Sequence, residues 1–393
     1  MKKQVLILAA TMLLASCGGN NSSAYTEKPG VAIAITELNA PLAKLSENFN
    51  SNTKFGVEAK AVENLDLSFR TIATPEIGLK DATYPVKSNG TATLKAGIDF
   101  TAFKASAALD SKISASATIP TVEFPDTIEN LEDFKPTLVE KNINIPETSL
   151  SAKAYLDDNR GYFDLSGAKN GVKTILTEIG KVGAPVDNAI SSIDAETLKY
   201  KTPEIPAETV DAIKALPDTI SGAIGEYGQL LVSVVEAASS ASYESGEFNL
   251  AQFVKAEKVD NDYRISLDAS LSQIAPLALS ALGDNVANIQ PTLEAILKVV
   301  DAKAHASITF NEKAILSVNF SVSASAKNLK LEDFIAEEAG ATIPVTDINL
   351  TADFGVGINF KYGNDVAIES LAEGDKASFQ EIGGGSSSAP EEE

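Results

Sequence analysis

The 393-residue sequence contains no tryptophan, one histidine and one cysteine, and only 6% of its residues are aromatic. One cysteine excludes a disulfide bond within the chain, and one histidine excludes a zinc site built from several histidines. The chain has neither a Gly-x-x-x-x-Gly-Lys phosphate loop nor a Gly-x-Ser-x-Gly nucleophile turn. Carboxylates are numerous but scattered, and no pair stands out as acid and base. We therefore expect no enzyme activity, no cofactor and no metal.

Positive charge is also scarce, with 32 Lys and Arg against 54 Asp and Glu and a net charge of −22. Nucleic-acid binding depends on cationic contacts with phosphates, so this balance argues against a nucleic-acid partner. It equally argues against electrostatic adhesion to anionic lipids. Hydrophobic residues make up 44% of the chain, which is typical of a folded protein.

The N-terminus has the layout of a secretory signal. Lys2 and Lys3 precede an apolar run from Val5 to Leu14, which is too short to span a membrane as a helix. The run ends in Leu14-Ala15-Ser16-Cys17, which resembles the lipobox of bacterial lipoproteins. The resemblance implies cleavage before Cys17 and acyl chains on its sulfur. It also implies a location in the cell envelope, where the lipid anchors the chain to a bacterial membrane on the periplasmic or surface side.

Long segments of the remaining chain alternate apolar and polar residues, which is the period of a strand with one buried face. Ordinary strands run to about 5–6 residues, and these segments are longer. They predict an α+β fold in which a long curved antiparallel sheet carries apolar helices on its concave face. The alternating segments are Phe55–Ala61, Ala92–Phe100, Ala314–Ala326 and Ile348–Tyr362.

Helical spacing appears in two clear stripes. Leu38, Leu42, Leu45 and Phe49 form the first stripe, and the second runs from Val172 to Ile179. A third helical region is predicted after Pro206, from Val210 to Val234, with a break at Pro217. The strongly apolar stretches 271–282 and 293–300 are predicted to be helices covered by the sheet. His305 falls among the polar positions of an alternating segment, so we expect it at the surface.

A turn is predicted at Asp157-Asp158-Asn159-Arg160-Gly161. An EF-hand calcium loop starting at Asp157 would need Gly at 162 and Glu at 168, where the chain has Tyr162 and Ala168. A hairpin is therefore favoured over a metal loop.

Two short sequence segments recur 200 residues later in the chain, which favours a protein built from two related halves. Leu131-Glu132-Asp133-Phe134 recurs 200 residues later as Leu331-Glu332-Asp333-Phe334, and Leu150-Ser151-Ala152 recurs as Leu350-Thr351-Ala352. The expected organisation is a signal peptide (1–16), a lipidated cysteine with a flexible tether (17–29), β-rich halves with helices (30–185 and 186–376) and a disordered acidic tail (377–393). Whether the halves are separate domains or one continuous sheet stays open.

The one-faced strands, the apolar helices and the membrane tether together resemble the lipid-handling half-barrel lipoproteins, such as the lipoprotein-carrier family. The hairpin Ala154–Leu165 and the strand–helix–strand order across 263–326 carry this resemblance. It implies an apolar, lipid-like ligand held between sheet and helices. The candidate lining residues are Leu279, Leu282, Ile296, Leu297, Phe354, Val356, Ile358 and Phe360. The alternative is a structural or surface-interaction lipoprotein whose apolar residues fill a closed core.

Overall fold

A computed structural model describes residues 27–48, 53–74, 79–123, 137–217, 253–273, 275, 297–330 and 345–382. The predicted signal peptide, Cys17 and three of the predicted lining residues, Leu279, Leu282 and Ile296, lie outside these residues.

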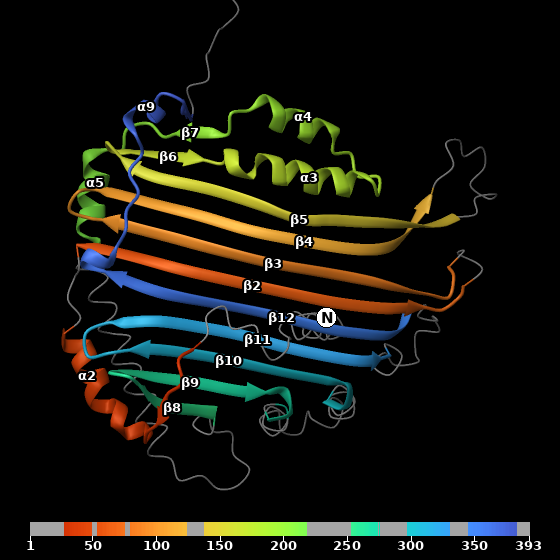
Figure 1. The fold of residues 1–393 in the computed structure, drawn as a ribbon, viewed down its shortest axis with the longest axis horizontal. Helices are drawn as coiled ribbons and strands as arrows, with labels where there is room; N and C mark the ends of the chain where they lie inside the picture. The colour runs from red at the N-terminus through yellow and green to blue at the C-terminus, as the bar shows by residue number, and fades with distance from the viewer. Residues whose placement is uncertain are drawn as a thin grey trace, which may run out of the picture.

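The described strands form one 13-stranded sheet in the order β1-β8-β9-β10-β11-β12-β2-β3-β4-β5-β6-β7-β13 (Figure 1). Neighbouring strands are antiparallel, except that β13 runs parallel to β7. Two meanders, β2 to β6 and β8 to β12, meet where β12 pairs with β2 from Val345–Thr71 to Tyr362–Phe55. The strands are β1 (Val31–Ala32), β2 (Lys54–Thr71), β3 (Ala82–Asp99), β4 (Lys104–Glu123), β5 (Thr137–Asp157), β6 (Arg160–Asp164), β7 (Lys199–Lys201), β8 (Val254–Val259), β9 (Asp262–Ser270), β10 (Val300–Phe310), β11 (Ile315–Leu329), β12 (Val345–Tyr362) and β13 (Gln380–Glu381).

The predicted α+β class, with helices on a concave face, is wrong, because the chain is dominated by this one sheet. The predicted alternating segments pair with one another in the described part of this sheet, whereas most of the predicted covering helices, 271–282 and 293–300, lies outside the described residues. The described parts of the two predicted helices, 271–273 with 275 and 297–299, are helical, and the chain passes from helix to strand at Val300, where β10 begins. The described α-helices are short: α2 (Asn39–Asn48), α3 (Lys169–Gly180), α4 (Asp187–Ala195), α5 (Ala207–Lys214) and α9 (Glu373–Lys376).

Alternation gives the sheet two unlike faces. We call the face that carries Val57, Ala96 and Val356 the apolar face, and the face that carries Lys60, Lys95 and Gly357 the polar face. The predicted strands 55–61, 92–100, 314–326 and 348–362 are confirmed in β2, β3, β11 and β12, except that Phe100 and Ala314 lie just outside β3 and β11. A β-bulge at the start of β11 pairs Ile315, rather than Leu316, with Phe310. The bulge therefore moves Leu316 off the apolar face, where the simple alternation had placed it.

Helix α2 covers the apolar face near one edge of the sheet. Three residues of the predicted stripe, Leu38, Leu42 and Leu45, are confirmed, because their side chains are 0% exposed and pack with Ala256 and Phe310, whereas Phe49 lies outside the described residues. Full burial of each leucine stabilises the fold by about 1.5–3 kcal/mol. This cluster holds the N-terminal segment against β8, β9 and β10.

Helix α3, the second predicted stripe, lies alongside β5 and continues the line of β6 (Figure 1). A Cβ atom at Gly171 would lie 2.4 Å from Leu150 Cδ2 and 2.5 Å from the Ser149 carbonyl oxygen. This contact needs glycine, and it lets the helix protect the β5 edge where β6 has ended.

The C-terminal segment crosses the polar face from the end of β12 towards β6 and β7 (Figure 1). It passes close to β3, because a Cβ at Gly97 would lie 2.7 Å from the Ala367 carbonyl oxygen. Phe379 is buried, and Gln380–Glu381 form β13. Ordered structure therefore extends past residue 376, into the segment that we predicted to be disordered.

The recurring segments lie in two hairpins of the same order. Leu150-Ser151-Ala152 lies in β5, which pairs with β4, and Leu350-Thr351-Ala352 lies in β12, which pairs with β11. The Leu-Glu-Asp-Phe repeats at 131–134 and 331–334 lie outside the described residues. The division into two related halves stays a prediction.

Candidate apolar ligand groove

A hollow lies on the apolar face where five strands, β2 to β6, run side by side. Strand register aligns its residues in two rows across the strands. Small side chains stand in the middle of the rows and larger ones near the ends. The first row is Phe55, Ile98, Ala105, Leu156 and Gly161, and the second is Val57, Ala96, Ala107, Ala154 and Phe163.

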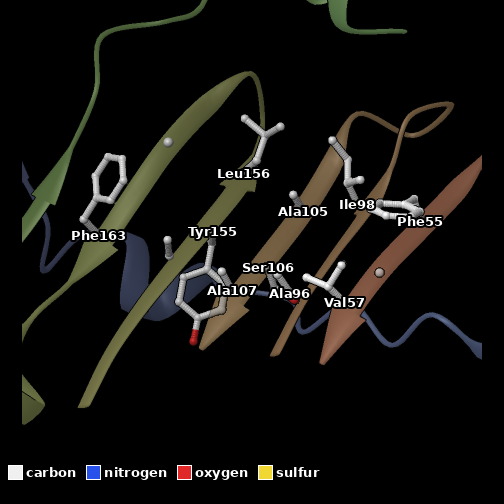
Figure 2. A pocket seen from close by; sticks show the side chains of 14 residues that line it. Phe55, Val57, Ala96, Ile98, Ala105, Ser106, Ala107, Tyr155, Leu156 and Phe163 are labelled. Carbon is white, nitrogen blue, oxygen red and sulfur yellow. The ribbon is translucent and has the colours of Figure 1, made fainter. Parts of the chain in front are cut away.

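The hollow has a volume of about 400 Å³ and is open to one side. Figure 2 shows Phe163 and Leu156 on one side of it, and Phe55, Ile98 and Val57 on the other. The alanines leave the strand backbones uncovered between these walls. Strands lie about 4.8 Å apart, so the five strands span about 19 Å. Such a trough suits a narrow hydrocarbon chain better than a compact polar ligand.

Large apolar side chains remain accessible on the same face, both in the groove wall and beyond it. Leu109, Phe320 and Phe354 are each 42% exposed, and Phe163 is 40% exposed. Scattered exposed apolar residues are ordinary, but these four share one face of one sheet. Large contiguous apolar patches on protein surfaces are typical of contacts with ligands, membranes or other proteins.

The four lining residues predicted on β12 lie together on the apolar face, next to the groove. Phe360 pairs with Val57, and the rings of Phe360 and Phe55 have centroids 6.0 Å apart. Phe354, Val356 and Ile358 follow along β12. Leu297 is half-buried and precedes β10 by three residues. Whether these residues contact a ligand stays a prediction.

Sequence reasoning missed the groove itself. Its walls come from β2 to β6, whereas the predicted lining came from β12 and the apolar stretches at 271–300. The alternation of Ala92–Phe100 and Phe55–Ala61 was visible, and the alanines at 96, 105, 107 and 154 were the available signal. Only strand register aligns these alanines into one floor.

The polar face carries a separate, partly buried charged cluster, the Glu27 cluster, formed by Glu27, Arg264, His305, Ser307 and Asn319. Glu27 Oε1 lies 3.2 Å from His305 Nε2 and accepts hydrogen bonds from Ser307 Oγ and from Asn319 Nδ2, the latter at 3.1 Å. Glu27 Oε2 lies 3.1 Å from Arg264 Nη1. His305 is on the polar face as expected, but it is ion-paired and half-buried rather than free in solvent.

In the Glu27 cluster, burial and the ion-pair contacts shift the pKa values of Glu27 and His305 in opposite directions. Burial raises the pKa of Glu27, but hydrogen bonds from His305 and Ser307 and the charges of His305 and Arg264 lower this pKa to about 2. The hydrogen bond with Glu27 raises the pKa of His305 to about 9, against burial and with help from Asp268. Both groups are therefore charged at neutral pH, and the cluster fixes the segment at Glu27 to β9, β10 and β11.

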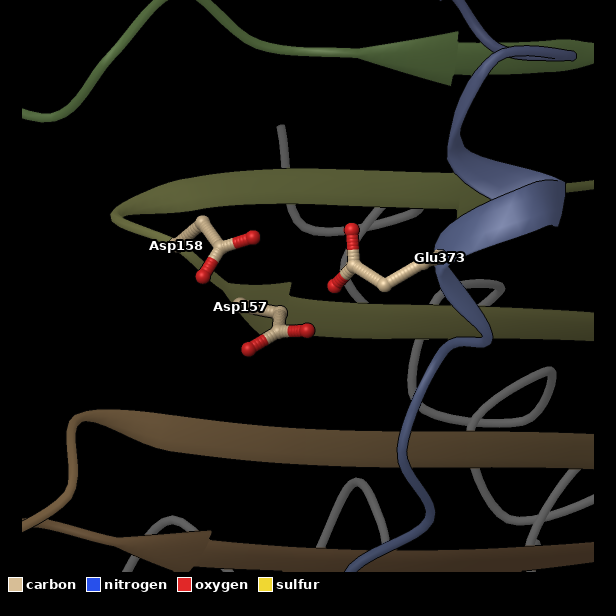
Figure 3. Close-up of side chains that lie close together, drawn as sticks. All are labelled: Asp157, Asp158 and Glu373. Carbon is tan, nitrogen blue, oxygen red and sulfur yellow. The ribbon is translucent and has the colours of Figure 1, made fainter.

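Three carboxylates, Asp157, Asp158 and Glu373, meet where the β5–β6 turn approaches α9 (Figure 3). Asp158 and Asn159 have φ values of 50° and 55°, as in a type I′ hairpin turn, so the predicted turn is confirmed. Lys376 Nζ stands among the three carboxylates, 2.9 Å from Asp157 Oδ2 and 2.6 Å from Glu373 Oε1. The Lys376 ammonium thus already occupies the space between the three carboxylates, and we assign no metal site to the cluster.

No protein-family model matches the chain, and no curated protein matches it. One solved structure with low similarity is a Pseudomonas aeruginosa FadL homologue, 6% identical over 86% of this chain and 99% of that chain, with a TM-score of 0.16. Another is the beta domain of the Bordetella autotransporter Brka, 8% identical over 79% of this chain and 99% of that chain, with a TM-score of 0.12. At these TM-scores the likeness carries no argument about fold or function.

Within the described part of the chain, no helix combines the length and apolar content that a membrane crossing requires.

Proposed function

We propose that this chain is a bacterial envelope lipoprotein that is tethered through lipid on Cys17 and binds a long-chain apolar ligand on the apolar face of its sheet. The groove of about 400 Å³ with its alanine floor is the observation that carries the proposal. The tether rests on the signal-like N-terminus and the lipobox resemblance. Binding of an apolar ligand in the groove requires no catalytic group.

Energetics favour a hydrocarbon chain over a polar ligand in this groove. Each buried methylene contributes about 0.8 kcal/mol, and the wall residues offer almost no hydrogen-bonding side chains. The exposed Phe354 and Leu109 extend the apolar surface beyond the groove, so a chain longer than the groove still finds contacts.

The test uses the full-length chain with Cys17→Ser, which cannot be lipidated. Native mass spectrometry of the purified protein is expected to show co-purified lipid. N-phenyl-1-naphthylamine, an uncharged fluorescent probe, is expected to bind and to be displaced by hexadecanol.

Ala107→Phe and Ala108→Phe form a matched pair, because these neighbours on β4 point to opposite faces. Ala107 stands in the groove floor, whereas Ala108 pairs with Lys95 and Lys153 on the polar face. Displacing two methylenes of ligand costs about tenfold in affinity, so we expect Ala107→Phe to weaken hexadecanol binding by about that factor. Ala108→Phe is expected to leave it within twofold.

A protein that carries no lipid and binds no probe would refute the proposal and leave a structural or surface-interaction lipoprotein. Equal affinities in the two phenylalanine variants would move the binding site away from the groove.

A further inference from the structure

One carboxylate stands on the apolar face. Glu63 of β2 lies in register between Phe354 of β12 and Gly90 of β3. On the apolar face, the residues from Phe55 to Leu67 of β2 stand in rows that extend across the sheet from β9 to β6. Among the described residues of these rows, Glu63 alone is charged. Every other acidic residue of β2, namely Glu58 and Asp66, points to the polar face.

The contacts of Glu63 leave most of its carboxylate available. Ser88 Oγ donates a hydrogen bond to Glu63 Oε1 at 2.7 Å. The other oxygen faces Gly90, where a side chain would begin only 3.2 Å away from it. Glycine at position 90 therefore keeps space open beside the carboxylate.

An uncharged chain laid across this face would strip water from the Glu63 carboxylate without replacing it, which is unfavourable. A ligand with a cation at this point would compensate the charge. Phe354, directly opposite Glu63 and 42% exposed, adds an aromatic face on which a cation is also favourable.

Along β2, the small side chains of Ala61 and Ala59 connect Glu63 with the groove. Ala61 and Ala92 form the next row, and Ala59 follows them along β2 towards Val57. Val57 and Glu63 are six residues apart on one strand, which is about 20 Å at 3.3 Å per residue. A long alkyl chain whose head lies at Glu63 would therefore reach the alanine floor.

We propose that the ligand is a cationic amphiphile with an amine head group, whose ammonium pairs with the Glu63 carboxylate beside Phe354 while its alkyl chain runs over Ala61 and Ala92 into the groove. This inference rests on the proposed function, since it names the class of ligand for the same face.

The test compares two ligands with the same chain, hexadecylamine and hexadecanol, by displacement of N-phenyl-1-naphthylamine from the full-length Cys17→Ser protein at 0.15 M salt. We expect at least about tenfold tighter binding of the amine, the effect of one charge-assisted hydrogen bond of about 1.5 kcal/mol. Glu63→Gln is expected to remove this preference and to leave hexadecanol binding within twofold.

Glu58→Gln is the matched control, because it removes the same charge from the same strand on the opposite face. The net charge of −22 attracts any amine weakly, and this control measures that background. It is expected to retain the amine preference. Glu63→Lys is expected to reverse it, so that hexadecanoate binds better than hexadecylamine.

The outcomes separate the two proposals. If hexadecanol binds but the amine has no advantage, or if Glu63→Gln keeps the advantage, the amine assignment is wrong and the apolar-ligand proposal stands. If neither ligand binds, the proposed function itself fails. Thermal unfolding of each variant checks that a lost preference does not reflect a lost fold.

Discussion

Glu27 and His305 lie 278 positions apart in the chain, yet Glu27 Oε1 and His305 Nε2 are only 3.2 Å apart. The pair joins the start of the described chain to the middle of β10. Because Arg264 and Asn319 contact the same carboxylate, one side chain links the segment at Glu27 to β9, β10 and β11.

This pair predicts a bell-shaped contribution to stability. The pKa of His305 rises from 6.5 to about 9, so its contribution is complete below pH 6.5 and is lost as the pH rises through about 9. The pKa of Glu27 falls from 4.5 to about 2, so its contribution is complete above pH 4.5 and is lost as the pH falls through about 2. The free energy gained from the pair is therefore largest between about pH 4.5 and 6.5.

Urea unfolding of the wild type and of Glu27→Gln from pH 3 to pH 10 measures this contribution. We expect the variant to be less stable by about 2 kcal/mol near pH 6, the scale of hydrogen bonds to a charged group, with a smaller difference at pH 10. A difference that does not change with pH would mean that the ion pair contributes nothing to stability.

Packing of α3 on β5 predicts a steric penalty at Gly171. Gly171→Ala gains helix propensity of about 1 kcal/mol, but the new Cβ would overlap Leu150 and the Ser149 carbonyl. Overpacking costs about 1–3 kcal/mol, so we expect a net loss of unfolding free energy. Gly374→Ala in α9 is the control, because no atom lies within 4 Å of its Cβ position. Thermal unfolding should show a lower Tm for Gly171→Ala, and the idea of close packing fails if both variants behave alike.

The Lys376 ammonium occupies the position between three carboxylates that a metal cation could fill in its absence. Lys376→Gln leaves the three carboxylates without their shared ammonium, and loss of this partner at the buried Asp157 should lower the free energy of unfolding by about 1–3 kcal/mol. Although burial raises the pKa of Asp157, its ion pairs with Lys376 and Lys104 hold this pKa below the usual value. Asp157 therefore stays ionised in the wild type.

Adding calcium to the Lys376→Gln variant shows whether the variant loses stability because a positive charge is missing or because packing is lost. Millimolar Ca²⁺ should restore stability to Lys376→Gln, since three carboxylate oxygens become free to bind it, and should leave the wild type unchanged. Lys173→Gln, which breaks the more exposed pair with Asp194, is the control and should cost less than about 1 kcal/mol. Stabilisation of the wild type by Ca²⁺ would contradict the assignment of Lys376 as the resident cation.

The successes and failures of sequence reasoning follow the range of the interactions involved. The stripe Leu38, Leu42 and Leu45 was predictable, because helical periodicity is a local property. The turn at Asp158-Asn159 was also predictable, since both residues tolerate positive φ. The α+β assignment failed because periodicity does not say which segments pair, and here the two meanders join into one sheet.

By itself, the sequence determined how side chains alternate within a regular strand: Ala96 to one face and Lys95 to the other. Tertiary structure alone decided which side chains become neighbours across strands. Glu63 stands beside Phe354, about 290 residues away, because β12 pairs with β2 in one register. Side-chain direction follows from the two-residue repeat of the backbone, whereas register depends on long-range pairing and bulges, and a slip of one residue would turn every side chain to the opposite face.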